Sequence, residues 1–217
     1  MALKKSTLLW MMILVLLAVI PAARAELSYL PDSSYYHGQT HYYVNLGNGE
    51  ILSGHIEFAV YDTLVYPDEY TGNAPGEGRY IYAYQIFNDS GSYNAALSYF
   101  AIKEIGDGAI PSDNPNENIG TDDSPFGVDS TDEYFSIDLT EGIWEFADGL
   151  IEAGDNSMFL LVRSDGKIKK GSYDLLPPEE GELPVPGEGD DGDMPVPEPA
   201  TCILLTLGGL LSLRKFG

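Results

Sequence analysis

The sequence predicts an all-β protein: a single antiparallel β-sandwich, flanked by an N-terminal signal helix and a short C-terminal transmembrane helix. About seven short segments have the alternation or the β-branched and aromatic content of strands, and turn-forming residues separate them. Both ends of the 217-residue chain carry a short apolar run. The hydrophobic fraction of 44% supplies material for a core despite a formal net charge of -23, whereas a wholly disordered acidic chain would lack it.

Residues 1–25 have the features of a secretory signal peptide, with a positive start and an unbroken apolar run over 8–20. Ala23 and Ala25 occupy both small-residue positions of an A-x-A cleavage site, so we expect signal peptidase to cut before Glu26. The alternative is an N-terminal membrane anchor. The apolar run, however, spans only about 20 Å as a helix, less than the roughly 30 Å hydrocarbon core of a bilayer.

Residues 26–176 form the predicted ectodomain, which contains all 15 tyrosines and no cysteine. It must therefore rely on a hydrophobic core, and we expect a stable monomer without disulfide or cofactor. The predicted strands are 51–63, 79–88, 95–105, 134–138, 143–146, 157–163 and 167–174.

Two of these strands have a distinct pattern. In 51–63, apolar residues alternate with others, which predicts a strand with one buried face, and Gly54 suggests a bulge. Residues 79–88 are aromatic or β-branched on both faces, which is typical of a central strand. Only 146–152 shows a weak helical period.

Residues 177–194 are predicted to be a disordered acidic linker, because proline and glycine oppose regular structure and the carboxylates repel one another. A sorting segment follows at 195–217. Its parts are the tripeptide Pro197, Glu198 and Pro199, an apolar run over 200–213 and the basic pair Arg214 and Lys215. The prolines keep the tripeptide extended, the run can enter a bilayer as a helix of about 21 Å, and the basic pair stays cytoplasmic.

This order of tripeptide, short apolar helix and terminal basic pair resembles the PEP-CTERM sorting signal of Gram-negative bacteria. The same segment is also known as an ice-binding-protein C-terminal domain, although the chain has no regular Thr-x-Thr array that would indicate ice binding. The resemblance implies processing by an exosortase, transient anchoring in the inner membrane, and release to the cell surface or extracellular matrix. A permanent C-terminal anchor without cleavage is the alternative.

The ectodomain also resembles a sandwich domain common in PEP-CTERM proteins. The motifs are G-x-x-x-x-A-V-Y over 54–61, Y-x-Y-x-Y-Q-I-x-N over 80–88 and S-Y-F-x-I over 98–102, followed by Trp144 and a G-x-x-S-x-F at 154–159. These are mostly core aromatics and turn residues. They imply a fold and an extracellular setting, and no activity.

The charge argues against nucleic acid and anionic membrane surfaces as partners, because both need clustered Lys and Arg. The sequence contains no G-x-S-x-G motif, and His37 and His41 lack the glutamate of an H-E-x-x-H zinc motif, so we expect no enzyme. Four tyrosines near the start of the ectodomain would either stack on sugar rings or fill the core: Tyr35, Tyr36, Tyr42 and Tyr43.

The loop 113–132 is the best metal candidate, because it offers the oxygen ligands that calcium prefers. The candidate ligands are Asp113, Asn116, Asp122 and Asp123, but their spacing does not match an EF-hand, and a solvated acidic loop is the simpler interpretation. The leading functional hypothesis is an exported, non-catalytic cell-surface or exopolysaccharide- and biofilm-matrix-associated protein. A carbohydrate- or calcium-binding surface module is the alternative.

Overall fold

The computed structural model describes residues 27–188 except 112, 123–126, 148 and 178, and these belong to one compact unit that spans Glu26–Pro195. The predicted all-β class is confirmed: two antiparallel sheets are present, and none of these residues lies in an α-helix. Within the same part of the chain, no helix is long and apolar enough to cross a membrane. The predicted signal peptide and the sorting segment 195–217 lie outside the described residues.

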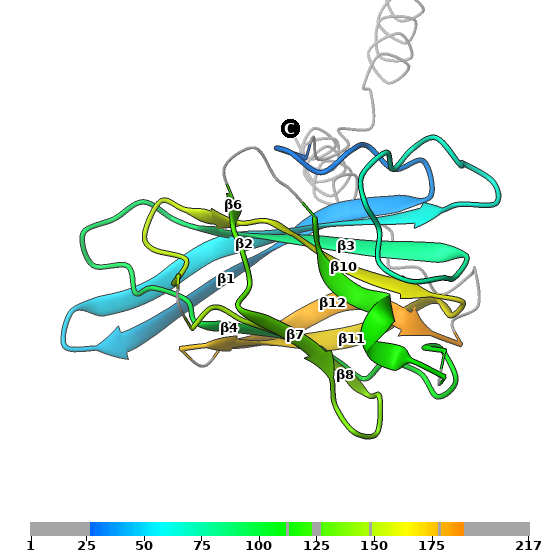
Figure 1. Ribbon diagram of the computed structural model, residues 1–217. Helices are drawn as coiled ribbons and strands as arrows, with labels where there is room; N and C mark the ends of the chain where they lie inside the picture. The colour runs from blue at the N-terminus through cyan, green and yellow to red at the C-terminus, as the bar shows by residue number, and fades with distance from the viewer. Residues whose placement is uncertain (1–26, 112, 123–126, 148, 178, 189–217) are drawn as a thin grey trace, which may run out of the picture. The chain divides into compact units, whose positions relative to one another are not determined.

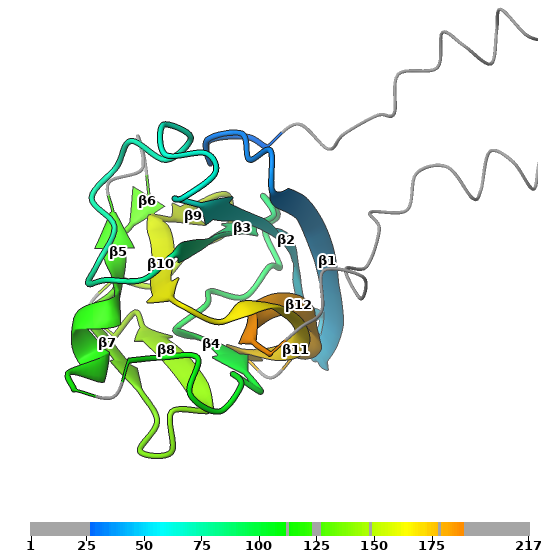
Figure 2. The same cartoon turned by 90° about the vertical axis from the view of Figure 1, so that its right-hand side faces the viewer.

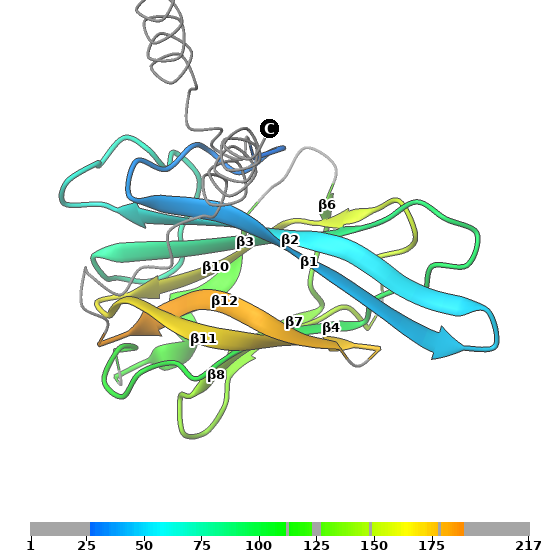
Figure 3. The ribbon, with the colours of Figure 1, turned by 180° about the vertical axis from the view of Figure 1, so that it is seen from behind.

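The first sheet has seven strands and the second has five (Figures 1 and 2). The first has the order β1-β2-β3-β10-β5, with β9 joining β3 to β6; its members are β1 (Tyr36–Gly47), β2 (Glu50–Asp62), β3 (Tyr80–Asn88), β5 (Ile119–Asp122), β6 (Gly127–Val128), β9 (Asn156–Ser157) and β10 (Phe159–Ser164). The second has the order β12-β11-β4-β8-β7; its members are β4 (Tyr99–Lys103), β7 (Asp132–Phe135), β8 (Glu141–Glu145), β11 (Lys167–Leu176) and β12 (Glu179–Gly187). A short 3-10 helix, Pro115–Asn118, precedes β5. The hairpin of β1 and β2 projects beyond the other strands (Figure 3).

The core lies between the two sheets, and an aromatic cluster joins them. Tyr84 comes from β3, whereas Phe100 and Trp144 come from β4 and β8; their ring centroids lie 5.6 to 6.3 Å apart. All three side chains are buried. Their polar atoms are satisfied, because Tyr84 Oη donates to the carbonyl of Pro184 and Trp144 Nε1 donates to the carbonyl of Gly120.

The outer face of the seven-stranded sheet is also partly buried, which the alternation in 51–63 does not predict. Residues 27–33, hereafter the N-terminal strap, cover this face, and Leu27 and Leu30 are buried against it. The prediction that β2 has one buried face is therefore wrong near its end. The outward-facing Glu57 is only 1% exposed, and its carboxylate accepts hydrogen bonds from the backbone N–H and hydroxyl of Ser28.

The prediction of a disordered linker over 177–194 is wrong for Glu179–Gly187, which form β12 along β11. Leu183 and Val185 are buried in the core, so the ectodomain extends past residue 176. Pro184 and Pro186 are tolerated because β12 lies at a sheet edge, where a missing N–H breaks no second ladder.

Gly54 is not a bulge. It pairs in register with Tyr42 on one side and Asn88 on the other. A side chain at this position would collide with the Tyr42 ring and the carbonyl of Phe87, so glycine makes room for a tyrosine whose hydroxyl donates to that carbonyl over 2.9 Å. The described residues within 146–152 form no helix.

Candidate functional site

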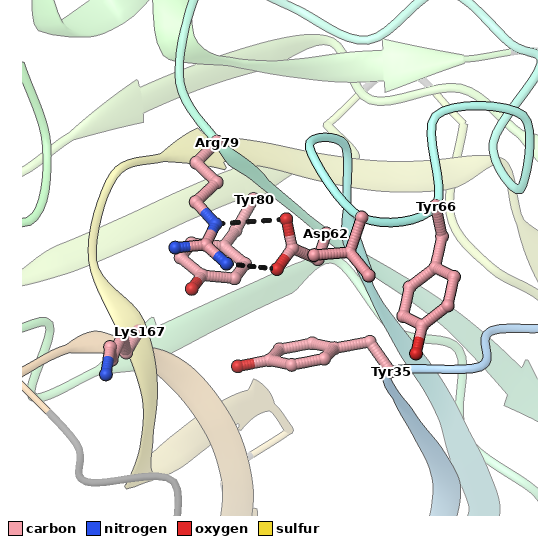
Figure 4. A pocket seen from close by; sticks show the side chains of 7 residues that line it. Tyr35, Asp62, Tyr66, Arg79, Tyr80 and Lys167 are labelled. Atoms are coloured by element: carbon pink, nitrogen blue, oxygen red, sulfur yellow. Dashed lines mark hydrogen bonds and ion pairs between the residues drawn. The ribbon is translucent and has the colours of Figure 1, made fainter.

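A surface hollow of about 210 Å³ opens where β1 begins, β2 ends and β3 and β11 begin (Figure 4). Strand pairing brings these four element ends together although they are far apart in the sequence. Seven side chains line the hollow: Tyr35, Asp62, Val65, Tyr66, Arg79, Tyr80 and Lys167.

Arg79 is fixed at the centre by Asp62. The guanidinium donates from Nε to Asp62 Oδ1 over 3.0 Å and from Nη2 to Oδ2 over 2.5 Å. Because these two nitrogens face Asp62, the third nitrogen, Nη1, points away from it, as Figure 4 shows. The Arg79 side chain is 38% exposed and lines the hollow, so a ligand can reach part of it.

Asp62 is buried and holds the loop that follows β2. Its Oδ1 also accepts from the N–H of Leu64, and its backbone carbonyl accepts from the N–H of Tyr66 over 2.8 Å. The hydrogen bond from Arg79 lowers the pKa of Asp62 and raises that of the guanidinium, so this pair remains charged at neutral pH.

Aromatic faces surround the arginine. The rings of Tyr35 and Tyr80 stack with centroids 5.5 Å apart, and the guanidinium carbon of Arg79 lies 4.9 Å from the Tyr80 ring centre. Tyr66 is 37% exposed at the rim. Tyr80 is only 2% exposed and supports Arg79, so the rings that a sugar can reach are those of Tyr35 and Tyr66. An apolar ring beside a fixed hydrogen-bond donor is what a sugar needs, because its C–H faces stack and its hydroxyls accept hydrogen bonds.

A second hollow of about 550 Å³ adjoins the first through Arg79, which lines both. Arg163 and Asp165 also line it, and Arg163 Nε donates to the carbonyl of Gly78 over 2.6 Å. Burial lowers the pKa of Arg163. Residues 26–176 contain only six Lys and Arg, and three of them, Arg79, Arg163 and Lys167, line the two hollows.

The chain matches no family model, no curated protein and no solved structure. The chemistry of the hollows is therefore the available guide to a ligand.

The described part of loop 113–132 does not assemble the predicted calcium site. Asp113 is exposed, Asn116 accepts from the N–H of Phe135, and Asp122 Oδ2 accepts from the Tyr70 hydroxyl over 2.7 Å. Asp123 lies outside the described residues. Elsewhere in the described chain, too, no three His, Cys, Asp or Glu side chains form a group that could hold a metal ion.

The tyrosine pairs divide between core and surface, as their alternation in a strand requires. Tyr36 and Tyr42 are buried, whereas Tyr35 lines the hollow and Tyr43 is 66% exposed. Sequence reasoning missed Arg79 and its partners in the hollow. The one available signal was the scarcity of basic residues in a chain of this charge.

Proposed function

We propose that the protein is an exported, non-catalytic β-sandwich that associates with exopolysaccharide in the biofilm matrix or at the cell surface. The observation that carries this proposal is the hollow around Arg79, where the partly exposed rings of Tyr35 and Tyr66 lie beside a partly exposed guanidinium. It favours a saccharide over calcium as the ligand, because Asn116 and Asp122 serve structural hydrogen bonds and Asp113 lies in solvent.

The geometry of Asp62 supports the absence of catalysis at this hollow. Glycoside hydrolysis needs one carboxyl group whose pKa is raised so that it can donate a proton. Asp62 is the carboxyl group lining the hollow, its pKa is lowered, and both of its oxygens already accept hydrogen bonds.

Binding is tested by affinity electrophoresis through gels that contain neutral glucans or uronate polymers. We expect the wild-type protein to be retarded by at least one polymer, and Tyr66→Ala to weaken that binding roughly two- to tenfold, the usual contribution of one aromatic stacking contact. The matched control is Tyr43→Ala, which removes an exposed tyrosine of β1 away from the hollow. Equal retardation of the two variants, or none of the wild type, would refute the assignment.

We also propose that an exosortase processes the chain at Pro197, Glu198 and Pro199, after signal peptidase has cut before Glu26. The proposal rests on the order of tripeptide, apolar run and basic pair in 195–217. Replacing the tripeptide by three alanines should leave the full-length protein in the inner membrane. Intact-mass analysis of surface or matrix material decides between cleavage and a permanent anchor, because only the anchor retains residues 200–217.

A further inference from the structure

Two histidines lie directly opposite each other on the outer face of the seven-stranded sheet. His41 of β1 pairs with His55 of β2, and the next rung on the same face pairs Gln39 with Glu57. Residues two apart in a strand point to the same side, so these four side chains form one block. The block lies at the surface, since His41 is exposed and the His55 side chain is 24% exposed.

Both imidazoles direct the same ring atom toward the Gln39–Glu57 rung. Nε2 of His41 accepts from the Gln39 side-chain amide over 3.3 Å, which places its lone pair on that side. Nε2 of His55 lies 3.7 Å from Glu57 Oε1. Both Nε2 atoms therefore lie on the same side of the histidine pair, the side nearer the Gln39–Glu57 rung.

Neighbouring groups hold the block in place. The His55 ring stacks on Phe87 of β3, with centroids 4.5 Å apart and planes 1° from parallel, and Phe87 in turn stacks on Tyr29 of the strap. Glu57 is fixed by the backbone N–H of Ser28 at 2.8 and 3.0 Å from its two oxygens. Glu57 can therefore place its negative charge beside the imidazoles while it keeps its hydrogen bonds to Ser28.

The spacing of the rings suits a shared metal ion. The two ring centroids are 5.6 Å apart and the planes are tilted by 44°. At a metal–nitrogen bond of about 2.0–2.1 Å, each ring centre lies about 3 Å from the ion, so rings up to about 6 Å apart can share it. Imidazole nitrogen is a preferred ligand of copper, zinc and nickel, whereas calcium takes oxygen.

We propose that His41 and His55 bind one divalent transition-metal ion, copper or zinc, through their Nε2 atoms. Water completes the coordination shell, and Glu57 offsets the charge of the ion from the neighbouring position. His37 is outside the site, because its Nδ1 is hydrogen-bonded to the carbonyl of Ser33 over 2.6 Å and its strand partner is Ala59. This proposal does not depend on glycan binding at the Arg79 hollow.

The test must separate imidazole ligation from the weak attraction that any chain with 34 acidic residues exerts on cations. The full chain in mild detergent is titrated with CuSO4 and followed by electron paramagnetic resonance, in which two coordinated imidazoles give nitrogen hyperfine couplings and carboxylates give none. Zinc affinity is measured by calorimetry with ZnCl2. His41→Gln is the main variant because this side chain is exposed, His55→Gln is the second, and His37→Gln is the matched control.

We expect one equivalent of copper with couplings from two nitrogens in the wild type and in His37→Gln. In His41→Gln, one nitrogen should be lost and zinc affinity should fall by more than about tenfold, a loss that even an outer-shell partner of a metal ligand can cause. A copper spectrum with oxygen ligands alone would overturn the proposal. So would wild-type affinity in His41→Gln, or loss of the nitrogen couplings in His37→Gln.

Discussion

Ending the ectodomain at Leu176 instead of at Glu188 should unfold it or bring it close to unfolding. The shorter chain lacks β12 and therefore the buried side chains of Leu183 and Val185. Burying each of these contributes about 1.5–3 kcal/mol to folding. The buried Tyr84 hydroxyl also loses its acceptor, the carbonyl of Pro184, at a cost of about 1–3 kcal/mol.

The expected loss is therefore about 4–9 kcal/mol, set against the 5–15 kcal/mol by which a domain of this kind is usually stable. Urea unfolding of chains that start at Glu26 and end at 176 or 188 measures the difference, with Trp144 as the fluorescent reporter because it is fully buried between the sheets. Two cooperative transitions whose free energies agree within about 1 kcal/mol would show that β12 contributes nothing.

A single substitution tests the same strand in the longer chain. Leu183→Ala should lower the free energy of unfolding by about 2–5 kcal/mol, because it leaves a cavity in the core. Leu176→Ala is the matched control, since this leucine is 49% exposed at the end of β11, and its effect should stay within about 0.5 kcal/mol. Equal losses in the two variants would contradict the reasoning.

Three further predictions concern the first sheet and are checked by urea unfolding. Gly54→Ala should destabilise by about 1–3 kcal/mol because its methyl group has no room, whereas Gly91→Ala, with nothing within 4 Å of the added carbon, should be close to neutral. Ser28→Pro removes the N–H that donates to the buried carboxylate of Glu57 and should cost about 1.5–3 kcal/mol, whereas Ser28→Ala keeps that donor, loses only the hydroxyl contact and should cost less. Asp62 has a lowered pKa, so its ionised form stabilises the fold above about pH 4; the advantage of wild type over Asp62→Asn should shrink as the pH falls from 4 toward 2, and a constant difference would contradict this.

Local patterns predicted the central strands well. The predicted strands 51–63 and 79–88 correspond to β2 and β3 within one residue at each end. Alternation and β-branched content predict them because both patterns reflect how the side chains of a strand are buried. β1 was not predicted as a strand with bounds, since Gly38, Gln39 and Thr40 weaken the pattern. At Gly38 a side chain would not fit, because the Phe58 ring of β2 lies over this position. The contact is between two strands, so the sequence of one strand alone does not predict it.

Other features depend on residues too distant in sequence to be predicted. From the sequence alone, Glu57 is expected to face solvent. It is buried because the N-terminal strap covers the outer face of β2 and brings Ser28 beside it. β12 has the composition of a disordered linker, yet its last five residues are buried and an edge position tolerates proline. The Arg79 hollow joins Tyr35 to Lys167, which come together through the pairing of β1 with β2, of β2 with β3 and of β3 with β10.

The edge position of β12 also bears on how the domain unfolds under a pulling force. A load that enters from the C-terminal side reaches the fold at Gly187, which pairs with Lys167 at the start of β11. A load directed away from β11 would open their ladder one pair at a time, toward the pair of Glu179 and Leu175, instead of shearing all pairs together. Sequential rupture needs less force than shear. Detachment of β12 would also take away the carbonyl of Pro184, and so it would uncover the buried Tyr84 hydroxyl in the aromatic cluster that joins the two sheets.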